Sequence, residues 1–361
     1  MHPPMTIIDR HLLSTFLRNL GHTLIGTLVL FTLMDLLDHM GSFVDNSAGL
    51  SMVLRYYLYK SAWTIDTVLP VATLMAVLFT VGTMARYLEM TALFAAGRSL
   101  LQVCAPLIAV AFLLSLGSMA WREYVLPEAN VRMHKVWEVE IHKNPDTINP
   151  TEHIAIRGPD DRKYYARKFD PETGILRGLK IMTVDGAKVV ERIDADRAEW
   201  NGRQWTLVGV VKREFRGEEE ITTHYARLTA TDLTIDPKGF YRDRIRQEDM
   251  NIRQLRDHAE LIRESGGNPT TALVDIQFQL AFPWVNLIVA LIGVVLASGP
   301  RKTTVASGFG LTLLISFGYY MFMNFGKSFG HSGTLPPVLS AWAGNVFFLT
   351  LFLVLFLRAR R

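Results

Sequence analysis

The chain has 361 residues, of which 49% are hydrophobic, and a formal net charge of +4. Its apolar residues are gathered into six long blocks, which excludes an ordinary soluble domain. No basic stripe with interleaved aromatic residues is present, so no nucleic-acid binding is expected, and the positive charge is assigned to loops beside a membrane. A single cysteine, Cys104, excludes an internal disulfide, and no spacing of ligand residues predicts a metal or other cofactor.

Three apolar segments come first, and each is long enough to cross a bilayer as a helix, which requires about 20 residues. They run from about Leu12 to Leu37, from Leu54 to Thr83 and from Leu100 to Trp121. The first segment is too long for the core of a signal peptide and is expected to be retained. Pro70 lies inside the second segment and predicts a kink within a packed bundle. The first membrane half is therefore assigned to residues 1–122.

The loop between the second and third segments predicts a short helix, over about residues 85–98, on the membrane surface. Apolar residues recur in it at near-helical spacing, and a glycine can end the helix. An exposed glutamate on such a helix can pair with an arginine of a cytosolic partner, whereas a simple turn helix in the interface is the alternative. The residues expected to dock are Arg86, Leu88, Glu89, Met90, Leu93, Phe94, Gly97 and Arg98.

Residues 123–270 predict an all-β domain inserted between the membrane halves. Six runs rich in β-branched and aromatic residues are separated by turn signals such as Asn201-Gly202. Many short strands at close spacing suggest a sandwich or a jelly roll. A charged amphipathic helix from Asn251 to Glu264, ended by Gly266-Gly267, leads back to the membrane. The predicted strands are His153–Arg157, Lys163–Phe169, Leu176–Val184, Ala187–Asp194, Gln204–Arg213 and Ile221–Leu228.

Three more apolar segments fill the second membrane half, residues 271–361, and complete a three-plus-three layout. They run from about Ala272 to Ser298, with Pro283 inside, from Val305 to Phe325 and from Pro337 to Leu357. Cytoplasmic loops carry an excess of lysine and arginine, so both termini are expected in the cytoplasm and the β domain outside. The basic residues on the cytoplasmic side are Arg10, Arg18, Arg86, Arg98, Arg301, Lys302, Arg358, Arg360 and Arg361.

Ionisable residues inside membrane segments are costly and are candidates for function. Arg55, Lys60 and Lys327 lie near the outer ends of their segments, where they could contact lipid phosphates or simply extend to the interface. Asp35 and Asp38 lie nearby and would repel phosphates unless they are paired. For Asp66, deeper in the second segment, a hydrogen bond or ion pair between helices is favoured over a proton relay.

The sequence contains no motif that predicts catalysis. It has no phosphate-binding loop, no H-E-x-x-H and no nucleophile elbow. The chain is therefore expected not to be an enzyme. If it moves cargo uphill, the energy must come from a partner or from an ion gradient.

Four features, in order along the chain, resemble the lipopolysaccharide export permease family, LptF/LptG. They are the segment Leu88–Ser99, the segment Tyr124–Asn130, the β insert and the segment Leu335–Trp342. Together with the three-plus-three layout, they cover essentially the whole chain. The opening Asp9-Arg10-His11 is slightly more similar to the G-type subunit than to the F-type. The implied fold is six transmembrane helices, three plus three, with an inserted periplasmic jelly roll.

The resemblance implies a permease subunit of an ATP-binding-cassette exporter in the inner membrane of a Gram-negative bacterium. It would extract lipopolysaccharide from the outer leaflet and pass it to a periplasmic bridge. The implied partners are a paralogous LptF-type permease subunit, a dimeric cytosolic LptB-type ATPase, a single-helix LptC-type protein and an LptA-type bridge. Glu89 would hold the position of the family's coupling acid.

The family also implies an apolar cavity lined by the first and fifth segments. Contact with bulk lipid or with other helices is the alternative for each residue. The candidate lining residues are Leu24, Leu28, Phe31, Leu311, Ile315, Tyr319, Phe322 and Met323.

Two other functions were weighed. A secondary lipid transporter or flippase without an ATPase predicts broken helices and ionisable groups at the midplane, for which Asp66 is the one good candidate. A scaffold or sensor that anchors a periplasmic β domain needs one or two spans, so six spans argue against it.

Overall fold

A computed structural model describes residues 7–143, 152–157, 162–170, 173–185, 188–216, 219–230, 233, 247–264, 268–298 and 305–359. The chain divides into two compact units: a helical unit of residues 1–133 and 270–361, and a β unit of residues 134–269. Several residues named in the predictions above lie outside the described ranges. They are Arg301, Lys302, Arg360, Arg361, Ala187 and the Gly266-Gly267 pair.

Within the described ranges, the helical unit has six helices that are long and apolar enough to cross a membrane. At Pro283 a 3₁₀ turn, Phe282–Trp284, divides the fourth span into two helices. The spans are α1 (Ile7–Asp45), α2 (Leu50–Arg86), α4 (Leu100–Tyr124), α8 (Thr270–Ala281) with α9 (Val285–Ala297), α10 (Val305–His331) and α11 (Pro337–Ala359).

The centre of the helical unit is formed by α2 and by α8 with α9, which are mostly buried, whereas α1 is mostly exposed. A Cβ on Gly293 of α9 would lie 3.0 Å from side-chain atoms of both Leu74 and Val77, so the glycine lets α9 lie close against α2. Across the α1–α2 contact, the Thr23 hydroxyl donates to the Ala72 carbonyl at 3.1 Å. Together these contacts place the core along α2.

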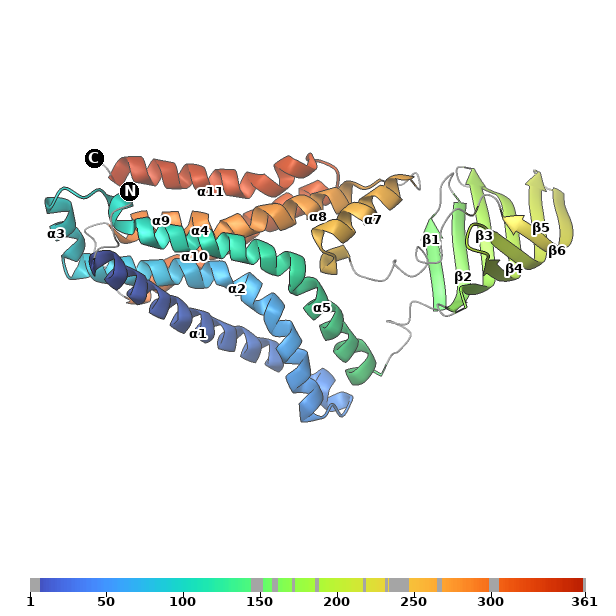
Figure 1. The fold of residues 1–361 in the computed structure, drawn as a ribbon, viewed down its shortest axis with the longest axis horizontal. Helices are drawn as coiled ribbons and strands as arrows, with labels where there is room; N and C mark the ends of the chain where they lie inside the picture. Colours follow the sequence, from blue (N-terminus) through green and yellow to red (C-terminus); the bar gives the residue numbers. More distant parts are fainter. Residues whose placement is uncertain are drawn as a thin grey trace. The chain divides into compact units, whose positions relative to one another are not determined.

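Polar side chains satisfy backbone carbonyls near both prolines, as a packed membrane bundle requires. Asn345 on α11 donates its amide to the Ala281 carbonyl, at the end of α8, over 2.8 Å. The Tyr320 hydroxyl on α10 donates to the Thr67 carbonyl, one turn before Pro70. The start of α1, the end of α11 and the short helix α3 (Glu89–Ala95) lie at the same end of the helical unit (Figure 1).

The β unit contains one antiparallel sheet, and its six strands confirm the six predicted runs. Each strand pairs with the next one along the chain, which is the order of a meander. A jelly roll requires Greek-key crossings between two sheets, so the described strands show the simpler topology. The strands are β1 (Glu152–Arg157), β2 (Arg162–Asp170), β3 (Ile175–Asp185), β4 (Lys188–Trp200), β5 (Trp205–Arg216) and β6 (Glu219–Ala230).

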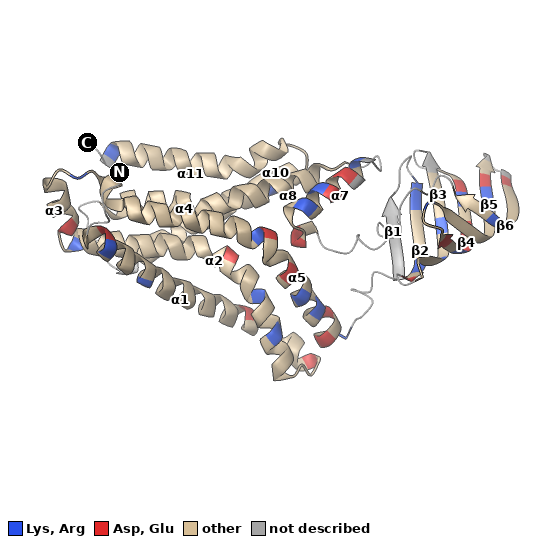
Figure 2. Ribbon diagram, viewed as in Figure 1, with Lys and Arg blue, Asp and Glu red and all other residues tan. Residues whose placement is uncertain are grey.

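One face of the sheet carries an apolar core that includes Tyr164, Leu179 and Trp205. Charged residues recur along the strands of the sheet (Figure 2). In β5, Gly209 has φ +67° and faces Asp196, whose Oδ2 would lie 2.2 Å from a Cβ on the glycine. Only glycine fits this position, because both the backbone angle and the space exclude a side chain.

Helical segments precede and follow the strands of the β unit in the sequence. The helix α5 (Leu126–Lys135) runs into it and is followed by the π-helical turn Val136–Ile141. The predicted amphipathic helix is confirmed as α7 (Ile252–Glu264). Asn251 and Gln254 exchange hydrogen bonds between side chain and backbone at 2.8 and 3.0 Å, which is a capping box that fixes the start of α7.

Candidate functional site

The short helix α3 begins where α2 is interrupted. α2 ends at Arg86, and Leu88 adopts the left-handed conformation with φ 62° before α3 starts at Glu89. A left-handed residue cannot continue a right-handed helix. The expected helix over residues 85–98 is therefore too long: the turn at Tyr87 and Leu88 reduces it to seven residues.

The end of α3 forms a Schellman motif. Gly97, with φ +83°, donates its N–H to the Phe94 carbonyl at 2.9 Å, and Arg98 donates to the Leu93 carbonyl at 3.1 Å. Ser99 then caps α4 in a capping box with Gln102. The predicted role of Gly97 as the helix stop is confirmed, and two consecutive caps define the path from α3 into α4.

The side chains of α3 divide into an inner and an outer set. Met90 is buried in the core of the helical unit, and Leu93 packs partly against that core. Leu88 and Phe94 are exposed large apolar residues, and Glu89 is exposed between them in the sequence. α3 is thus anchored on the core by Met90, and this segment exposes two apolar side chains and a carboxylate.

The two arginines at the ends of this segment differ in their surroundings. Arg86, in the last turn of α2, is exposed. Arg98 is half-buried, and its guanidinium lies 3.9 Å from the Asp9 carboxylate of α1. The pair of Arg98 and Asp9 ties the loop to the start of the chain.

At the opposite end of the helical unit, Lys60 lies in a polar cluster between α1 and α2. Its ammonium donates to Asp35 at 2.5 Å and to the Tyr56 hydroxyl at 3.0 Å. The Tyr57 hydroxyl also donates to Asp35 at 3.1 Å, and His39 lies 3.5 Å from the same carboxylate. Asp35 and Lys60 therefore neutralise each other, which explains how an acid is tolerated near this end of α1. Arg55, one turn away on α2, is exposed.

A second cluster, again with an aspartate, a lysine and a histidine, joins α8 and α10. Lys327 and His331 lie 3.2 and 2.9 Å from one carboxylate oxygen of Asp275. The carboxylate is almost buried, whereas both basic side chains are about one-third exposed. Lys327 is thus paired within its own chain, as Lys60 is.

Asp66 forms a buried ion pair, which confirms the interpretation of this residue as a helix contact. Arg122 of α4 approaches its carboxylate at 2.8 and 2.9 Å, and Ser118 donates to it at 3.1 Å. The guanidinium also stacks over the Phe282 ring at 4.0 Å. The pair joins α2 to α4 beside the break at Pro283.

The eight candidate cavity residues do not share one environment. Tyr319 and Met323 are buried in the chain's own core, where Tyr319 stacks on Phe348 and donates to Asn345 at 2.5 Å. These two side chains have little surface left for a lipid chain, so their assignment to the cavity lining is corrected to internal packing. Phe31 and Phe322 are exposed. The partly buried ones are Leu24, Leu28, Leu311 and Ile315.

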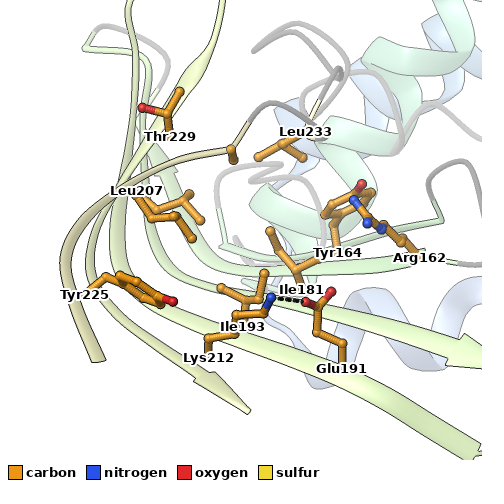
Figure 3. A pocket seen from close by; sticks show the side chains of 12 residues that line it. Arg162, Tyr164, Ile181, Glu191, Ile193, Leu207, Lys212, Tyr225, Thr229 and Leu233 are labelled. Atoms are coloured by element: carbon orange, nitrogen blue, oxygen red, sulfur yellow. Dashed lines mark ion pairs between the residues drawn. The ribbon is translucent and has the colours of Figure 1, made fainter. Parts of the chain in front are cut away.

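The β unit has a pocket of about 240 Å³ on the face that carries its core. Strands β2 to β6 all contribute to it, with Ile193 and Leu207 among its apolar walls and Tyr225 at one side (Figure 3). At its edge Lys212 pairs with Glu191 at 2.8 Å and with Glu214 at 3.0 Å. The hydrogen bonds that it donates to Glu191 and Glu214 raise the pKa of Lys212.

Several residues of these sites were missed in the sequence. Arg122, Asp275 and His331 were not singled out, although each lies in or at the end of an apolar span, and an ionisable residue there is a signal by itself. His39 follows Asp35 by four residues, a spacing that places both on one helix face. Their pairing across helices could not be found, because it joins positions 25 to 56 residues apart.

Together, the fold and these sites define a class: a membrane protein with six transmembrane helices and an inserted β domain. The chain matches the family described as lipopolysaccharide export system permease LptF/LptG over residues 10–358. It belongs to this family of transporter permeases, as the resemblance of its motifs predicted, and the match covers F-type and G-type subunits alike. Among curated proteins, none matches the chain.

Proposed function

We propose that the chain is the permease subunit of an ATP-binding-cassette exporter that extracts lipopolysaccharide from the outer leaflet of the inner membrane. It would pass the lipid to a periplasmic bridge protein. The observation that supports this proposal best is α3, a short helix anchored by Met90 with Leu88, Glu89 and Phe94 exposed. Membership of the lipopolysaccharide export family supports the choice of cargo.

The proposed role of α3 is to dock a cytosolic ATPase dimer of the LptB type. Exposed apolar side chains supply area, and a carboxylate can form a charge-assisted pair with an arginine of the ATPase. Because Met90 and the two caps hold α3 on the core, a movement of the ATPase would be transmitted to α2 and α4. The excess of lysine and arginine at this end supports a cytoplasmic location.

The proposed lipid path begins between subunits. α1 and α10 expose large apolar residues such as Phe31 and Phe322, which suit acyl chains in a cavity closed by a paralogous LptF-type subunit. Arg55, Lys60 and Lys327, at the end opposite α3, are proposed to meet the lipid phosphates. Because Lys60 and Lys327 have internal carboxylate partners, a phosphate would exchange with those partners.

The later steps are proposed to take place on the β unit. Its pocket, lined by residues of strands β2 to β6, has apolar walls such as Ile193 and Leu207 beside charged residues such as Lys212, and is proposed to hold part of the lipid as it is passed toward an LptA-type bridge. An LptC-type protein with a single helix would complete the assembly. A flippase driven by an ion gradient is less well supported, since Asp66, the candidate ion-binding residue, forms an ion pair with Arg122.

The experiment that tests this function is charge reversal at Glu89. Glu89→Arg is expected to reduce copurification of a cytosolic ATPase with the tagged chain, and to reduce ATP-dependent release of lipopolysaccharide, by about tenfold, the equivalent of 1.4 kcal/mol. Glu128→Arg is the control, because Glu128 lies exposed on α5 and its ion pair with Arg132 is also exposed. Unchanged copurification and unchanged release in Glu89→Arg would sink the coupling role.

A further inference from the structure

The cluster of Asp275, Lys327 and His331 has the layout of an anion site. Lys327 and His331 are four residues apart on α10, so they lie on one helix face and converge on one carboxylate oxygen. Both basic side chains are 34% exposed, whereas the Asp275 side chain is 8% exposed. The accessible side of the cluster is therefore basic, and its acidic member is on the inside.

The charge of the cluster depends on the imidazole. With His331 neutral, one lysine and one aspartate cancel; with His331 protonated, the cluster has a net charge of about +1 at neutral pH. Nε2 lies 2.9 Å from Asp275 and donates to it. The other ring nitrogen, Nδ1, is then an acceptor in the neutral ring and a donor in the protonated ring. Protonation thus converts Nδ1 from an acceptor, which repels an oxyanion, into a donor, which can bind one.

Few other titratable groups face this cluster from the helices packed around α10. α8 contributes Asp275 alone, and α11 has no titratable side chain before Arg358 in its last turn. The charged residues of α2 are Arg55, Lys60, Asp66 and Arg86. Asp66 acts electrostatically on Tyr320 of α10, as does Arg122 of α4. Among the described contacts, Asp275 is the carboxylate beside His331, and Lys327 shares it.

We propose that Lys327, His331 and Asp275 form a protonation-dependent binding site for a phosphate monoester of a lipid headgroup. The lipid ligand rests on the proposed function, whereas the basic pair and its internal carboxylate come from this cluster alone. Asp275 holds both cations in place while the site is empty. An incoming phosphate, with its three acceptor oxygens, bridges the Lys327 ammonium and the protonated His331 ring.

The similar cluster around Asp35 is a weaker candidate. The side chain of Lys60 is 15% exposed and donates to both Asp35 and the Tyr56 hydroxyl. His39 has its Nδ1 2.9 Å from the Asp35 backbone carbonyl, within its own helix. These groups are arranged to satisfy one another, whereas Lys327 and His331 present exposed surface.

The test uses the full chain with its copurifying subunits in nanodiscs, and diphosphoryl lipid A as the probe, at about pH 6 and about pH 8. Wild type is expected to bind about fivefold more tightly at the lower pH, as one added charge-assisted contact of about 1 kcal/mol implies. His331→Gln is expected to lose the tighter binding at the lower pH and to keep the affinity at pH 8 within about twofold. Lys327→Gln is expected to weaken binding at both values.

Three controls make the result specific. His22→Gln changes an exposed histidine on α1 and should keep the wild-type pH ratio. Dephosphorylated lipid A should show no tighter binding at the lower pH, and phosphatidylglycerol, a phosphodiester with a single charge, should bind more weakly than lipid A at both pH values. The unfolding temperatures of all variants are measured to show that they are folded. Lys327→Arg keeps the charge and is expected to bind like wild type, which separates loss of charge from loss of stability in Lys327→Gln.

A wild-type pH ratio in His331→Gln would overturn the proposal, as would an equal ratio with dephosphorylated lipid A. Binding of phosphatidylglycerol as tight as that of lipid A would overturn the assignment to a monoester. Folded wild type that binds lipid A at neither pH would contradict the lipid contacts of the proposed function as well. Binding that is normal but indifferent to these variants would contradict the inference alone.

Discussion

At the scale of single residues, three aspartates inside the spans are each balanced by a basic side chain of another helix. Asp35 lies against Lys60, Asp66 against Arg122 and Asp275 against Lys327. A charge in a low-dielectric region is tolerated when it is paired and hydrogen-bonded. The presence of each acid was visible in the sequence, but its partner was decided by helix packing.

Removing one member of the most buried pair should be costly. Asp66→Asn leaves the Arg122 guanidinium without its counter-charge and is expected to lower the free energy of unfolding by about 3 kcal/mol. The measurement is thermal unfolding of the purified chain in detergent. Replacing both residues, as Asp66→Leu with Arg122→Met, should restore most of the loss, since no isolated charge remains. Asp38→Asn, at an exposed acid on α1, should have little effect.

Lys212 gives a prediction about pH. Because its pKa is raised in the folded β unit, its ion pairs contribute stability below the pKa of the unfolded chain, about 10.5. That contribution is lost as pH rises through the higher folded pKa. The stability difference between wild type and Lys212→Met is therefore expected to shrink above about pH 10.5 in urea unfolding followed by tryptophan fluorescence. A difference that grows with pH would contradict the assignment.

At the scale of elements, α3 shows how far local signals reach. Gly97 was correctly predicted as the stop because a helix end in the left-handed conformation favours glycine. The start of α3 was placed wrongly, because Leu88 is left-handed without being glycine and no residue type signals this. The strands were predicted well for a related reason: alternation and turn residues are local properties.

Two substitutions separate anchoring from docking in α3. Met90→Ala removes a buried anchor and is expected to destabilise α3 locally by about 2–4 kcal/mol, seen as faster amide exchange over Glu89–Ala95. Leu88→Ala, at a side chain that is 67% exposed, should cost under about 0.5 kcal/mol. Its proposed effect is on ATPase copurification. Equal exchange rates in the two variants would refute the division of α3 into an inner and an outer set.

At the scale of the whole molecule, α1 is the span with the smallest buried share. The most apolar stretch of α1 is 11% buried, against 67% for α2. Exposed residues such as Val29 and Phe31 face lipid or another subunit. The proposed pairing with an LptF-type subunit predicts the second, because this surface of α1 is not covered by the chain's own helices.

Cysteine crosslinking checks this prediction, and the chain suits it because its one native cysteine, Cys104, is buried. In a Cys104→Ala background, Val29→Cys is expected to crosslink to a partner subunit in native membranes, giving a band at the summed mass. Thr23→Cys, on the buried face of α1, is the matched control and should give no such band. Failure of Val29→Cys, together with Phe31→Cys, to crosslink would mean that this face is in contact with lipid.

The sequence by itself determined the number of spans, the place of the β insert, its six strands and the family. These follow from hydrophobic length, alternation and short motifs, which are properties of neighbouring residues. Only the tertiary structure decided which lysines are neutralised, that Tyr319 and Met323 are internal, and that Asp275 gathers Lys327 with His331. Those facts depend on contacts between helices far apart in the chain, and no local pattern encodes them.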